Sequence, residues 1–196
     1  MIKVPDTTPK KLGELLVESG LVNDWQLQLG FRIQRDSGNR LGEALVEGSF
    51  ITEDELLVAL SGQLQVPHIR LFEKGPIRLK YPGLDTTVVL GDPTALEAMP
   101  ASIARRHGVF PLTLRKVWHG YELLVATTKP TDFDLSDELS SVLQLKVRTV
   151  LATQSDIANA IECFYGDDDD NTSARLYRPN FSRSGRNQRG KAHVNA

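Results

Sequence analysis

Apolar residues between residues 10 and 66 recur three and four positions apart, which is the spacing that gathers side chains on one face of a helix. Thr52 and Glu55 have the form of a capping box, which marks the first turn of a helix. Asn23 is placed to cap an earlier helix in the same way. The pattern therefore predicts a short helix followed by a longer helix, and then the same pair again.

Beyond Pro67 the pattern changes to short runs rich in Val, Leu, Thr and aromatic residues, which alternate with helical stretches. His119-Gly120 supplies a hairpin turn between the first two runs. Strands alternating with helices are typical of a small α/β sandwich. The predicted strands cover residues 109–114, 121–127 and 147–151, the predicted helices cover 100–107, 136–143 and 154–165, and residues 74–82 are predicted to be a loop.

These patterns divide the chain into parts and set its fold class. The expected class is α+β, with an all-helical tandem-repeat subdomain over residues 10–66 and a small α/β sandwich over residues 67–166. Residues 1–9 are expected to be a loose leader. Residues 167–196 begin with four aspartates, continue with Asn, Ser, Arg and Gly, and are expected to form a disordered basic tail.

Composition narrows the class of protein. The net charge of −2 gives no general attraction to nucleic acid or to anionic membranes, and six of the basic residues lie in the tail. No run of about 18 apolar residues could cross a bilayer. A single cysteine, Cys163, rules out an internal disulfide and is expected to be a buried small residue of the last helix. The expected location is the cytoplasm.

A stretch of 24 residues occurs twice, over residues 11–34 and 40–63. At a shift of 29 residues the copies are identical at eight positions, whereas average composition gives about one or two. Packing alone poorly explains a repeated glycine and glutamine, because neither fills a core well. Such a duplication suggests a surface built for a partner with two similar halves. The identical pairs are Leu12/Leu41, Gly13/Gly42, Glu14/Glu43, Leu16/Leu45, Val17/Val46, Glu18/Glu47, Leu27/Leu56 and Gln34/Gln63.

Each copy follows one pattern: a basic residue, Leu-Gly, paired aliphatics, a turn, two spaced leucines and a final glutamine. This pattern resembles the MshEN domain, the N-terminal domain of type II secretion and type IV pilus assembly ATPases. The later segments 121–132, 153–157 and 164–166 are similar to the second half of that domain. The resemblance covers about residues 10–166.

The resemblance implies binding of cyclic di-GMP, a bacterial second messenger whose two guanines and two phosphates are related by a near two-fold axis. Basic side chains would stack on guanine or pair with phosphate. The glycines would let the backbone approach the ligand, apolar residues would wall the bases, and glutamines would pair with guanine. The implied ligand-binding residues are Lys11, Leu12, Gly13, Glu14, Leu27, Phe31, Gln34, Arg40, Leu41, Gly42, Glu43, Leu56, Leu60 and Gln63.

Two residues depart from the family pattern. Lys11 stands where the pattern has arginine, and lysine cannot present a planar fork of donors to a phosphate or a base. Ser49 stands where copy one has Gly20, and the neighbouring Gly48 is expected to take over the turn. Both changes would weaken nucleotide binding.

No enzymatic activity is expected, because the chain lacks the Gly-x-x-x-x-Gly-Lys-Ser/Thr phosphate loop and other catalytic motifs. His68, His107 and His119 have no partner at metal-ligand spacing, so no metal is expected.

The leading hypothesis is a stand-alone cyclic di-GMP-binding adaptor that lacks the ATPase motor domain and regulates a secretion or pilus system. Its expected partners are the secretion or pilus ATPase or an inner-membrane platform protein. Such a partner would recruit it to the inner membrane without membrane insertion. The alternative is a docking module of the same machinery whose nucleotide site has decayed. Binding of nucleic acid through helix-turn-helix-like units is a weaker third hypothesis, against which the acidic body argues.

Overall fold

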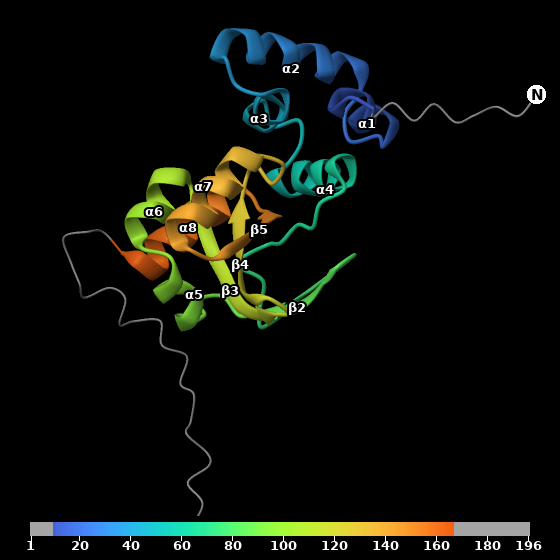
Figure 1. The fold of residues 1–196 in the computed structure, drawn as a ribbon. Helices are drawn as coiled ribbons and strands as arrows, with labels where there is room; N and C mark the ends of the chain where they lie inside the picture. Colours follow the sequence, from blue (N-terminus) through green and yellow to red (C-terminus); the bar gives the residue numbers. More distant parts are fainter. Residues whose placement is uncertain (1–9, 167–196) are drawn as a thin grey trace, which may run out of the picture.

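The computed structural model describes residues 10–166, so the predictions for the leader (1–9) and the tail (167–196) lie outside the described residues. Within this range, helices come first and a mixed α/β arrangement follows (Figure 1). The helical subdomain consists of α1 (Leu12–Glu18), α2 (Asp24–Ser37), α3 (Leu41–Glu47) and α4 (Glu53–Leu64). The second subdomain consists of β1 (Ile77–Tyr81), β2 (Leu84–Val88), α5 (Pro93–Ala98), α6 (Ala101–His107), β3 (Val109–Val117), β4 (Gly120–Thr127), α7 (Phe133–Leu143), β5 (Lys146–Leu151) and α8 (Gln154–Tyr165).

Both predicted caps form in the helical subdomain. The backbone N–H of Gln26 donates to Asn23 Oδ1 over 2.9 Å at the start of α2. At the equivalent start of α4, the backbone N–H of Glu55 donates to Thr52 Oγ1 over 3.2 Å. Each bond satisfies a donor that the first turn of a helix cannot satisfy itself. The two copies therefore begin their longer helices in the same way, as the sequence predicts.

The core of the helical subdomain is itself duplicated. Its buried members are Leu16, Val22, Leu45 and Ile51, none more than 5% exposed. Leu16 and Leu45 are 29 residues apart, and so are Val22 and Ile51. The repeat in the sequence is thus a repeat in packing, because equivalent residues of the two copies meet in one core.

The turn that joins the helices of copy two differs from the sequence prediction. Gly20 has a positive φ of 73° in copy one, and Ser49 itself takes the equivalent conformation at φ 56°. Gly48 stays right-handed at φ −72°, so it does not take over the turn. A serine in this conformation crowds its Cβ against the backbone, which costs about 1 kcal/mol relative to glycine.

The second subdomain is built on a three-stranded sheet with β4 in the middle, antiparallel to β3 and parallel to β5. Successive β4 residues face opposite sides, so that Leu124 packs into one core cluster and Leu123 into the other. The β1–β2 hairpin and α8 cover the first side, and α5, α6 and α7 cover the second (Figure 1). This arrangement confirms the predicted α+β class.

Residues 74–82 are not the loop that the sequence analysis predicts. Ile77–Tyr81 form β1, which pairs antiparallel with β2 across a turn at Pro82 and Gly83. The alternation of apolar and charged residues in this strand places Leu79 inward and Arg78 outward. Pro82, the last residue of the predicted loop, begins the turn of a hairpin.

Cys163 is exposed, contrary to the expectation that it is buried. The buried face of α8 runs through Ile157 and Ala160, with Phe164 packed beside them. Cys163 lies at the solvent edge of that face.

The chain after α4 fastens the two subdomains together. The backbone N–H of Ile69 donates to the Leu151 carbonyl, and the Leu151 N–H donates to the Pro67 carbonyl, each over 2.9 Å. The linker thereby extends the sheet beside β5. A salt bridge of 3.3 Å between Arg70 and Asp54 ties it back to α4. These contacts fix the position of α4 above the sheet.

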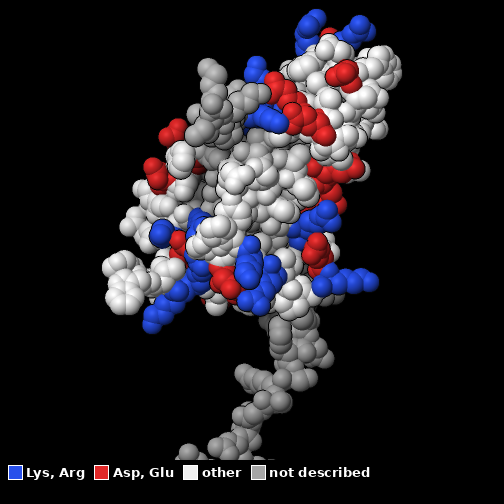
Figure 2. All heavy atoms as spheres, turned by 90° about the vertical axis from the view of Figure 1, so that its right-hand side faces the viewer, with Lys and Arg blue, Asp and Glu red and all other residues white. Residues whose placement is uncertain are grey.

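Charges of both signs are mixed on the surface. Ion pairs of exposed side chains join Lys10 to Glu18 and Arg78 to Asp85. Figure 2 shows a face on which acidic and basic side chains lie next to one another. Among residues 10–166, no helix combines the length and the apolar character that crossing a bilayer requires.

Candidate functional site: a cleft between the subdomains

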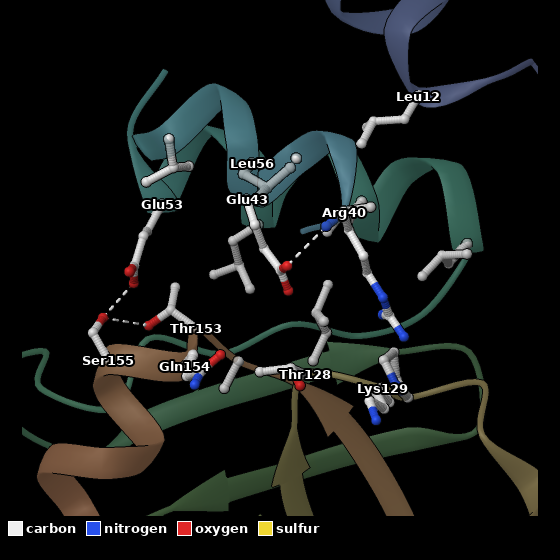
Figure 3. Close-up of a pocket in the computed structure, with 18 of the residues that line it drawn as sticks. Leu12, Arg40, Glu43, Glu53, Leu56, Thr128, Lys129, Thr153, Gln154 and Ser155 are labelled. Atoms are coloured by element: carbon white, nitrogen blue, oxygen red, sulfur yellow. Dashed lines mark hydrogen bonds between the residues drawn. The ribbon is translucent and has the colours of Figure 1, made fainter. Parts of the chain in front are cut away.

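A cleft of about 870 Å³ separates α3 and α4 from the second subdomain (Figure 3). This volume falls within the range of small-molecule sites, roughly 300–1,000 Å³. One wall comes from the helical subdomain, and the floor comes from the loops that follow β4 and β5. The wall contains Leu12, Asn39, Arg40, Leu41, Gly42, Glu43, Val46, Glu47, Glu53, Leu56, Leu57, Leu60 and Leu64, and the floor contains residues 128–132, 151–155 and Ala158.

Half of the residues predicted from the tandem motif line this cleft. All but one of them come from copy two, and Leu12 is the contribution of copy one. The cleft brings together Leu12, Arg40, Leu41, Gly42, Glu43, Leu56 and Leu60, whereas Lys11, Gly13, Glu14, Leu27, Phe31, Gln34 and Gln63 lie outside it.

The repeated glycines have a packing role in both copies. A Cβ on Gly13 would lie 3.2 Å from Leu27 Cδ1, and a Cβ on Gly42 would lie 2.6 Å from Leu56 Cδ1. In each copy, the missing side chain lets the first helix approach a leucine of the second helix. Close helix packing accounts for the repeated Gly and Leu independently of any ligand.

The repeated glutamates have a capping role. Glu43 Oε2 accepts from the backbone N–H of Arg40 over 3.0 Å, and Glu14 Oε2 accepts from that of Lys11 over 3.3 Å. These bonds satisfy backbone donors at the starts of α3 and α1. The carboxylate of Glu43 nevertheless faces the cleft and retains acceptor capacity there (Figure 3).

The basic residues of the motif have no such internal role. The Arg40 side chain extends from the start of α3 toward the floor of the cleft (Figure 3). Within residues 10–166 its guanidinium has no carboxylate partner. Lys11 holds the equivalent place in α1 and is exposed. An unpaired guanidinium in an open cleft is available to an anionic ligand.

The two glutamines differ from each other. Gln63 Nε2 donates to the Lys10 carbonyl over 2.9 Å, beside a second hollow of about 400 Å³. Gln34 is half-buried in α2 and makes no side-chain hydrogen bond to another described residue. The structure thus gives Gln63 a contact that holds the start of the first copy against α4.

The floor of the cleft contains polar residues that the motif did not predict. Thr128, Lys129 and Thr131 follow β4, and Gln154 and Ser155 follow β5. Because β4 and β5 are parallel, their carboxyl ends meet at the same edge of the sheet, where open α/β sheets bind ligands. The two predicted strands, separated by a predicted helix, were the signal that could have placed these residues together.

A hydroxyl–carboxylate hydrogen bond closes one end of the cleft. Ser155 Oγ donates to Glu53 Oε2, which joins the start of α8 to the start of α4 (Figure 3). Among residues 10–166, no group of three or more His, Cys, Asp or Glu side chains is arranged to hold a metal ion. The lining of the cleft offers hydrogen-bonding groups, charged side chains and apolar surface.

Comparison with known proteins places this fold in a family. Residues 79–171 match the model of the MshEN domain. The chain is 31% identical over 157 residues, or 80% of its length, to the type IV pilus assembly ATPase PilB of Myxococcus xanthus. It is 30% identical over 138 residues, or 68% of its length, to the type IV pilus assembly ATPase PilB of Thermus thermophilus. These alignments span 24% and 13% of the respective relatives.

A solved structure of MshE with cdg is similar in fold. The superposition has a TM-score of 0.58 and 27% sequence identity, and it covers 78% of this chain and 97% of that one. The MshEN model matches the second subdomain, whereas the tandem motif lies in the first. The structural similarity spans both. The chain therefore carries an MshEN domain and is homologous to part of the pilus assembly ATPase PilB.

Proposed function

We propose that residues 10–166 are a cyclic di-GMP-binding regulatory domain of a type IV pilus or type II secretion system. The similarity to MshE with cdg, the usual abbreviation of cyclic di-GMP, supports the ligand. The homology to PilB supports the machinery. The proposal assigns no catalysis to these residues and places the protein at the cytoplasmic side of the machine.

The observation that carries the proposal is the state of Arg40. Of the repeated features, the glycines and leucines pack the helices and the glutamates cap them, whereas the Arg40 side chain remains unpaired within residues 10–166 and faces an open cleft. Cyclic di-GMP carries two phosphates and two guanine faces, and a guanidinium can bind either.

The apolar wall beside Arg40 suits the bases of the ligand. Leu41, Leu56 and Leu60 line the cleft and are only half-buried, so a stacked guanine would cover apolar surface that is now in contact with water. A dissociation constant of about 1 μM corresponds to about 8 kcal/mol of binding free energy. Apolar contact and a few charge-assisted hydrogen bonds can together supply this amount.

Copy one repeats these residue types, but Leu12 is the one described residue of its motif that lines the cleft. Leu27 is half-buried, Phe31 is 39% exposed, and Lys11 replaces the arginine. A lysine supplies charge but not a planar fork, so we expect copy one to contribute less to binding than copy two. The proposed ligand would therefore depend most strongly on Arg40.

Calorimetric titration of an Arg40→Ala variant tests the proposal. Loss of a charge-assisted contact is expected to weaken cyclic di-GMP binding by about tenfold to a hundredfold. Arg106→Ala is the matched control, because Arg106 is exposed on α6 and does not line the cleft. Equal affinity of the two variants would contradict the proposal. Absence of binding by the wild-type protein would favour the docking module, and the search would then turn to pilus or secretion partners.

A further inference from the structure

The floor of the cleft carries a second cation, Lys129, which lies outside the tandem motif. Lys129 is exposed on the loop between β4 and α7, and Thr128 precedes it. Figure 3 shows Arg40 extending from the wall toward the end of the cleft where Lys129 lies. The two cations thus come from different subdomains and face one space.

Neither cation is neutralised by the protein. Within residues 10–166, no carboxylate forms an ion pair with Arg40 or with Lys129. Two like charges facing a cleft without a partner repel each other, and an anion between them would remove that repulsion.

The carboxylates of the cleft, in contrast, already have donors. Glu43 accepts from the Arg40 N–H, Glu47 from Asn39 Nδ2, Glu53 from Ser155 and Asp132 from the Leu135 N–H. Two of them, Glu43 and Glu53, lie away from Lys129 along the cleft (Figure 3). The carboxylates of the cleft therefore accept from donors of the protein itself, whereas Arg40 and Lys129 have no carboxylate partner within residues 10–166.

We infer that Lys129 is a phosphate-binding residue of the same ligand, so that one cyclic di-GMP bridges the two subdomains. The inference rests on the proposed function for the identity of the ligand. A phosphate lies between Arg40 and Lys129, with the Thr128 hydroxyl as a further donor. A guanine edge, which presents N–H donors, then faces the Glu43 carboxylate.

This arrangement has a mechanical consequence. Arg40 stands at the start of α3, and Lys129 stands on the loop before α7, which leads into β5. A ligand held from both sides stabilises the arrangement in which α3 and the β4–α7 loop face each other. Binding of the ligand to the helical subdomain thereby also constrains the position of the second subdomain.

The test compares Lys129→Ala with Lys116→Ala by calorimetric titration with cyclic di-GMP. Lys116 is exposed on β3 and does not line the cleft, so it is the matched control. Lys129→Ala is expected to weaken binding by about tenfold or more, Lys116→Ala to leave it unchanged, and Lys129→Arg to retain it. Because salt screens charge–charge contacts, the affinity of Lys129→Ala is expected to fall less steeply with rising salt concentration than that of the wild-type protein.

Hydrogen exchange supplies a second readout in the unmutated protein. Bridging predicts that cyclic di-GMP protects the backbone amides of Thr128, Lys129 and Thr131 as well as those of α3. Protection confined to residues 10–66, or wild-type affinity in Lys129→Ala, overturns the bridging but leaves the proposed function standing. Absence of any binding by the wild-type protein overturns both.

Discussion

Gly30 provides a quantitative test of the packing that positions Arg40. It lies in α2, where a Cβ would come within 2.5 Å of Leu45 Cδ2 and 3.0 Å of Leu45 Cγ. Leu45 is a fully buried residue of α3, so its side chain cannot move aside into solvent. Because Arg40 immediately precedes α3, the approach of α2 to α3 sets where the Arg40 side chain begins.

The expected cost of Gly30→Ala follows from two opposing effects. Alanine gains about 1 kcal/mol over glycine in a helix interior. Forcing an extra carbon into a packed interface costs about 1–3 kcal/mol. Gly62 lies in α4, and a Cβ added there would meet no atom of another described element within 4 Å, so Gly62→Ala keeps the gain without the cost. The difference between the two variants isolates the packing cost at about 1–3 kcal/mol.

Urea denaturation at 25 °C measures this difference directly. We expect the unfolding midpoint of Gly62→Ala to rise and that of Gly30→Ala to lie clearly below it, with equal slopes for both transitions. If Gly30→Ala proved as stable as Gly62→Ala, the close approach of α2 and α3 would be refuted, and with it the explanation of how Arg40 is positioned.

Two further predictions concern stability. Ser49→Gly is expected to raise the free energy of unfolding by up to about 1 kcal/mol, or the melting temperature by about 2–4 °C, because Ser49 adopts the left-handed conformation that Gly20 adopts in copy one. An unchanged or lower melting temperature in scanning calorimetry would contradict this expectation. Burial raises the pKa of Glu122, but hydrogen bonds and charge from Arg115 and Lys146 outweigh burial, so the net pKa lies below its usual value. The stabilisation from Glu122 should therefore be complete above about pH 4.5 and lost as pH falls further. Urea denaturation should show that Glu122→Gln lowers the free energy of unfolding by about 1–3 kcal/mol at pH 7 and by less at pH 3.5. An equal loss at both pH values would contradict the assignment.

The sequence predicted the helical subdomain well because its signals are local. Capping residues such as Asn23 and Thr52 and the helical spacing of leucines act within a few residues of one another. The same holds for α8, whose predicted bounds agree with the structure. The β1 strand was missed because its five residues alternate apolar and charged side chains over too short a stretch to stand out from the loop predicted over residues 74–82.

The site was harder to predict because it depends on how two subdomains face each other. The motif located Arg40 and the leucines around it, but it did not distinguish residues that pack, such as Gly13, from residues that face the cleft. Lys129 is about ninety residues from Arg40 in the chain, and the two line one cleft because α4 is held over the second subdomain through Glu53 and Asp54. Such long-range juxtaposition follows from topology rather than from any local pattern.

The central claim is that this domain binds cyclic di-GMP, and calorimetric titration of the wild-type protein tests it most directly. The titration uses cyclic di-GMP as the ligand, with GTP and cyclic di-AMP as controls. The account predicts selective binding of cyclic di-GMP with a dissociation constant of about 1 μM or tighter, which corresponds to about 8 kcal/mol or more. Absence of binding, or equal binding of all three nucleotides, would contradict it.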